Sequence, residues 1–120
     1  MPRFHRDLDA WKFAMDLAAE IYNYTGCHPA HEKFGLIAQM RRAAVSIPSN
    51  IAEGAARETN REFLRFLVIS RGSLAEVQTL LLLTVKLGLS GSDVDDLIEK
   101  TERLSAILAG LINQQRAQKT

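Results

Sequence analysis

Four stretches of the chain carry apolar residues at steps of three and four, and only short breaks separate them. This spacing places the apolar side chains of each stretch on one face of an α-helix. No stretch alternates apolar and polar residues for long enough to indicate a β-strand. The sequence therefore predicts an all-α fold, with helices spanning about 8–24, 31–56, 59–87 and 93–113.

The breaks between these stretches contain residues that begin or end helices. Gly26 and Pro29 end the first helix, and Gly88 follows the third helix as a C-terminal cap. Thr59 and Glu62 have the spacing of a capping box at the start of the third helix. Because short connections make successive helices antiparallel, we expect one domain, residues 1–120, that forms an antiparallel up-down-up-down four-helix bundle.

Pro48 lies inside the second helical stretch. A proline at this position removes one backbone hydrogen bond and crowds the preceding turn. We expect a kink at Pro48, because the apolar spacing continues in phase through Ile51. The alternative is a pair of shorter helices broken at residues 46–48.

The chain has more apolar residues than one bundle needs to bury. A bundle helix buries about three positions in seven. The first helix instead has two apolar rows, which are Leu8, Trp11, Met15, Ala18, Tyr22 and Ala10, Ala14, Leu17, Ile21, Tyr24. The later helices add Phe66, Ile69, Leu80, Leu83, Ile98, Ile107 and Ile112 outside their main seams. Large exposed apolar patches are unfavourable in soluble proteins, so this surplus predicts a homo-oligomer.

The composition is typical of a soluble cytoplasmic protein. A length of 120 residues fits one domain, and 47% hydrophobic residues can form a core. Cys27 is the only cysteine and cannot form an internal disulfide. The longest apolar run, residues 80–83, is far shorter than the ~20 residues of a membrane span. We expect no membrane association.

The charges are nearly balanced overall but segregated along the chain. Fifteen basic and 14 acidic residues give a net charge of +1, which argues against coating of nucleic acid by bulk charge. Residues 41–71 nevertheless contain an arginine strip: Arg41, Arg42, Arg57, Arg61, Arg65 and Arg71. Three glutamates oppose these six arginines, and such a strip suits the phosphates of RNA or DNA. The alternative is that the arginines pair with glutamates inside the bundle or across a subunit interface.

A polar row runs along the second helix beside its apolar seam. Its members lie at steps of four, four, three and four: Arg42, Ser46, Asn50, Glu53 and Arg57. We interpret Ser46, Asn50 and Glu53 as a candidate subunit interface. The alternative is an ordinary solvated face, with Ser46 helping to satisfy the backbone near Pro48.

Signals for metal binding and catalysis are weak. The cluster Cys27, His28, His31 and Glu32 matches no strong zinc-site spacing. Ser73 lacks the second glycine and the preceding strand of a nucleophile elbow, and no glycine loop for phosphates occurs. The sequence therefore predicts no metal, no cofactor and no enzyme, with a small metal-dependent enzyme as the least favoured alternative.

Several motifs resemble a known family. They are QMRRAAVSIPSNIAEG at 39–54, REFLRFL at 61–67 and RGSLAE at 71–76, with Asp7, Leu8 and Trp11 upstream. Together they are similar to the 23S ribosomal RNA intervening-sequence protein family, also called the bacterial four-helix bundle family. The resemblance covers the chain from about Phe4 to Ile112.

The resemblance implies a bacterial four-helix bundle that assembles into a ring, typically a homopentamer. Some relatives are encoded inside inserts in ribosomal RNA genes, and most have no established activity. A related branch, the accessory protein of diversity-generating retroelements, is a basic pentamer that binds nucleic acid and a reverse transcriptase. The net charge of +1 departs from that branch. Self-association and contact with RNA or DNA are thus the partners that the resemblance implies.

Overall fold

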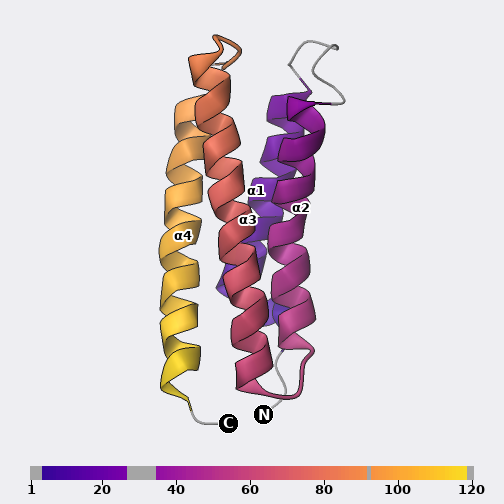
Figure 1. Ribbon diagram of the computed structural model, residues 1–120, viewed down its shortest axis with the longest axis vertical. Coiled ribbons are helices and arrows are strands. Elements are labelled where there is room, and N and C mark those ends of the chain that lie inside the picture. Colours follow the sequence, from indigo (N-terminus) through magenta and orange to yellow (C-terminus); the bar gives the residue numbers. More distant parts are fainter. Residues whose placement is uncertain (1–3, 27–34, 92, 119–120) are drawn as a thin grey trace.

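The structure is a computed structural model that describes residues 4–26, 35–91 and 93–118. Four α-helices make up its fold. They are α1 (Asp9–Thr25), α2 (Leu36–Ala55), α3 (Asn60–Lys86) and α4 (Val94–Ala117), preceded by the short 3-10 helix η1 (His5–Asp7). The described residues form no β-strand. The prediction of an all-α four-helix bundle is confirmed (Figure 1).

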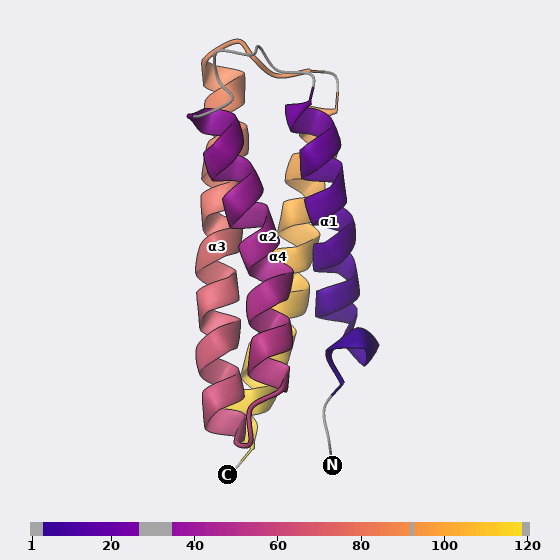
Figure 2. The ribbon, with the colours of Figure 1, turned by 90° about the vertical axis from the view of Figure 1, so that its right-hand side faces the viewer.

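The four helices lie side by side along an elongated molecule of 47 × 22 × 19 Å. Both α1 and α3 pack against α2 and α4, so that α1 and α3 face each other diagonally across the core. Figure 2 shows these two helices on opposite sides of the bundle. The α2–α3 connection and both ends of the chain lie at one end of the bundle, and the α3–α4 connection lies at the other (Figure 1).

The core is built from the apolar seams, because burial of apolar side chains is the main driving force for packing helices together. Its largest fully buried side chains come from all four helices and include Leu17, Ile47, Phe63 and Leu104. Of the two apolar rows in α1, the row from Ala10 to Tyr24 is buried. The other row lies at the edge of the core, where Met15 and Tyr22 are exposed.

The helix ends largely follow the local signals in the sequence. Thr59 is the N-cap of α3, and its side-chain oxygen accepts a hydrogen bond from the backbone N–H of Glu62 at 3.1 Å. Gly88 follows α3 with a φ of 72°, a left-handed conformation that glycine adopts without steric cost. Helix α2 begins at Leu36, later than expected, and residues 31–34 lie outside the described part of the chain.

Helix α2 passes through Pro48 as one continuous helix. The alternative of two shorter helices is therefore wrong. The kink that we expect at Pro48 stays a prediction.

Helices α2 and α3 approach each other closely at Gly54. A Cβ atom added to Gly54 would lie 2.6 Å from the Cβ of Phe66 and 3.1 Å from Cδ1 of Phe63. No side chain larger than hydrogen fits this gap without movement of a helix. Ser70 adds a second link, because its hydroxyl donates to the backbone carbonyl of Ile47 at 2.9 Å.

A buried hydrogen bond also crosses the core. The hydroxyls of Tyr24 in α1 and Thr84 in α3 are 2.7 Å apart, and Thr84 donates to the carbonyl of Leu81. Tyr24 therefore donates to Thr84, and both buried hydroxyls are satisfied. The long side chain of Tyr24 thus joins the two diagonal helices.

Among the described helices, α3 alone is long and apolar enough to cross a membrane. One such helix is weak evidence of a membrane span, since a core helix of a soluble bundle has the same length and composition. In this fold α3 buries Phe63, Leu67 and Leu81 against the other helices.

Candidate interaction surfaces

The arginines of the predicted strip point in different directions. Arg41 turns toward α1, where its Nε donates to the hydroxyl of Thr25 at 2.8 Å. Its guanidinium also donates to the carbonyl of Tyr22 at 3.3 Å and lies 4.5 Å from the centre of the Tyr22 ring. Arg41 therefore ties α2 to α1, and its charge is engaged within the chain.

Arg57 is also engaged within the chain, at the end of α2. Its guanidinium is 3.0 Å from the carboxylate of Glu53 and 4.9 Å from the centre of the Phe66 ring on α3. The ion pair is exposed, so it contributes little to stability. The guanidinium of Arg57 therefore lies between Glu53 of α2 and Phe66 of α3.

The other four arginines, Arg42, Arg61, Arg65 and Arg71, are exposed. None forms an ion pair within the part of the chain that the structure describes. Arg71 lies 11 residues after Asn60. Because 11 residues make about three full helical turns, both residues lie on the same side of α3. The amide of Asn60 contacts Gln118 beyond the end of α4, so Arg71 belongs to the side of α3 nearer α4.

Ser46 of the polar row contacts α3 of the same chain, and Asn50 bonds to Ser46. The hydroxyls of Ser46 and Ser73 are 2.9 Å apart. The side-chain amide of Asn50 donates to the Ser46 carbonyl at 2.8 Å and to the Ser46 hydroxyl at 2.9 Å. Ser46 thus joins α2 to α3, whereas Asn50 bonds within α2. A subunit interface at Ser46, Asn50 and Glu53 stays a prediction.

One concave surface is a groove between α1 and α2, which we call the α1–α2 groove. It has a volume of about 540 Å³. Its lining residues include Trp11, Met15, Ala18 and Tyr22 from α1 and Val45 and Pro48 from α2. These side chains are mainly apolar, so the groove suits an apolar partner.

Five large apolar side chains are exposed on different sides of α3, and we call this set the α3 ridge. Its members are Val68, Ile69, Leu82, Leu83 and Val85, of which Leu82 is 56% exposed. Ile69 and Leu83 were predicted as surplus apolar residues, and their exposure confirms this. The predicted surplus at Leu80 and Ile112 is wrong, because both side chains are buried in the core.

Sequence reasoning missed Val68 and Leu82. Steps of three and four from Val68 through Gly72, Ala75 and Thr79 reach Leu82, so these residues share one side of α3. That spacing was visible in the sequence. It describes a second stripe on the side of α3 away from its seam.

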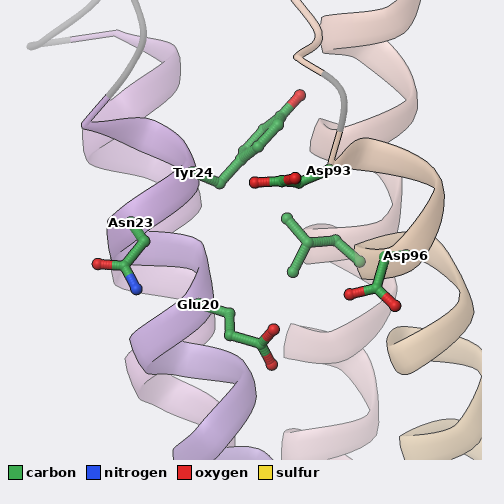
Figure 3. A pocket seen from close by; sticks show the side chains of 6 residues that line it. Glu20, Asn23, Tyr24, Asp93 and Asp96 are labelled. Atoms are coloured by element: carbon green, nitrogen blue, oxygen red, sulfur yellow. The ribbon is translucent and has the colours of Figure 1, made fainter.

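A smaller polar pocket lies between α1 and α4 and has a volume of about 250 Å³. Figure 3 shows Glu20 of α1 and Asp96 of α4 pointing toward each other, whereas Asn23 points away. Lys100 donates hydrogen bonds to both carboxylates, with its Nζ 3.0 Å from Asp96. These hydrogen bonds raise the pKa of Lys100, and the one to Glu20 has the larger effect. The ammonium group therefore offsets one of the two negative charges that Glu20 and Asp96 carry beside this pocket.

The described residues contain no group of three or more His, Cys, Asp or Glu side chains that could hold a metal ion. The cluster of Cys27, His28, His31 and Glu32 lies outside the described residues. The described surfaces can bury apolar side chains and contact anions.

The model of the 23S rRNA-intervening sequence protein family matches residues 6–110 of this sequence. The chain belongs to this family. Both the α1–α2 groove from Trp11 onward and the α3 ridge lie within the residues that the 23S rRNA-intervening sequence protein model matches. No curated protein sequence matches the chain.

A solved structure shares the fold of this family member. It is a crystal structure of a protein of unknown function from the S23 ribosomal protein family of Bacteroides thetaiotaomicron. The two chains are 19% identical and superimpose with a TM-score of 0.79, over 86% of this chain and 97% of the other. This likeness supports the four-helix fold.

Proposed function

We propose that this protein is a non-enzymatic cytoplasmic scaffold that works as a closed homo-oligomer. The observation that carries the proposal is the exposed apolar surface on two sides of one bundle. Leu82, Val85 and Met15 are 56%, 45% and 46% exposed, respectively. Transfer of such side chains out of water is favourable by about 25 cal/mol per Å² of apolar surface. Association of copies removes this surface from water.

The family resemblance supports a ring of five subunits. We expect a native mass close to five times the 13.4 kDa of one chain. Native mass spectrometry and light scattering at micromolar protein concentration measure it directly. A monomer at that concentration contradicts the proposal, because the apolar surfaces would then stay exposed without a partner.

Contact with RNA or DNA is a second function that a separate observation favours. Arg42, Arg61, Arg65 and Arg71 are exposed and lack ion pairs with described residues. In a ring each arginine occurs once per subunit, so weak phosphate contacts add through avidity. This arrangement compensates for the low net charge of +1.

The double variant Arg61→Gln/Arg65→Gln tests this contact. We expect at least a tenfold loss of affinity for a single-stranded RNA or DNA probe at low salt, and a shallower dependence on salt concentration. The control is Arg103→Gln/Arg116→Gln, which removes the same charge from α4 and leaves α3 intact. Equal losses of affinity in both variants would indicate that bulk charge, and not the arginines of α3, attracts the nucleic acid. If the wild type binds no nucleic acid, the alternative of a purely structural oligomer is supported.

A further inference from the structure

We draw no further inference here: the strongest candidate, the mainly apolar groove between α1 and α2 with Trp11, Met15 and Val45 in its walls, carries none because nothing in the structure shows what covers it.

Discussion

Replacement of Gly54 with alanine should lower the melting temperature of the protein by roughly 5–10 °C. The added Cβ would lie 2.6 Å from the Cβ of Phe66 and 3.3 Å from the backbone carbonyl of Phe63. Neither atom can rotate away, because both are fixed to the backbone of α3, so the two helices must separate. Overpacking costs about 1–3 kcal/mol, and the 2.6 Å clash with an atom fixed to the backbone places Gly54→Ala in the upper part of that range. This cost exceeds the gain of about 1 kcal/mol in helix propensity.

Gly110→Ala is the matched control. Gly110 is also inside a helix, but a Cβ atom there meets nothing within 4 Å. The same substitution should therefore raise the free energy of unfolding by about 1 kcal/mol. Thermal unfolding followed by circular dichroism at one fixed protein concentration measures both variants. A Gly54→Ala protein as stable as the wild type would show that α2 and α3 are not in close contact at this point.

Replacement of Phe63 with alanine should destabilise the protein by about 3–5 kcal/mol. Phe63 is 0% exposed and lies in the core beside Gly54. Removal of its ring leaves a cavity that the rigid helices fill only in part. Because a domain of this size is stable by about 5–15 kcal/mol in total, a large fraction of the variant should be unfolded at moderate urea concentration.

Phe66→Ala serves as the comparison, since it makes the same change three residues later. Phe66 is only half-buried, and its ring stacks with the guanidinium of Arg57. The loss should be about 1–2 kcal/mol, from partial burial and one cation–π contact. Urea unfolding of both variants gives the difference. Equal losses would contradict the assignment of Phe63 to the core.

The helices and their seams could be predicted because their signals are local and periodic. The seam residues Phe63, Leu67 and Leu81 are buried as the spacing indicates. The Thr59 cap depends on one hydrogen bond within a single turn. The sequence could not show which apolar row of α1 faces the core. Both rows have helical spacing, and only the positions of α2 and α4 distinguish them.

The surfaces were harder to predict because each depends on two helices or on a side-chain direction. Arg41 and Arg42 are adjacent in the sequence, but a step of one residue turns a helix by about 100°. Arg41 therefore reaches Thr25 on α1, whereas Arg42 is exposed. The α1–α2 groove has no sequence motif, since its walls come from segments about 30 residues apart and their register is a tertiary property.

The position of both ends of the chain at one end of the bundle has a practical consequence for the proposed ring (Figure 1). In a closed ring whose bundles run along the ring axis, rotation relates the subunits, so all amino and carboxyl termini would emerge on the same rim. A fluorescent protein fused to either terminus would crowd that rim in every subunit. The opposite rim, formed by the α3–α4 turns, would stay accessible. A probe attached there would not crowd the rim that carries the termini.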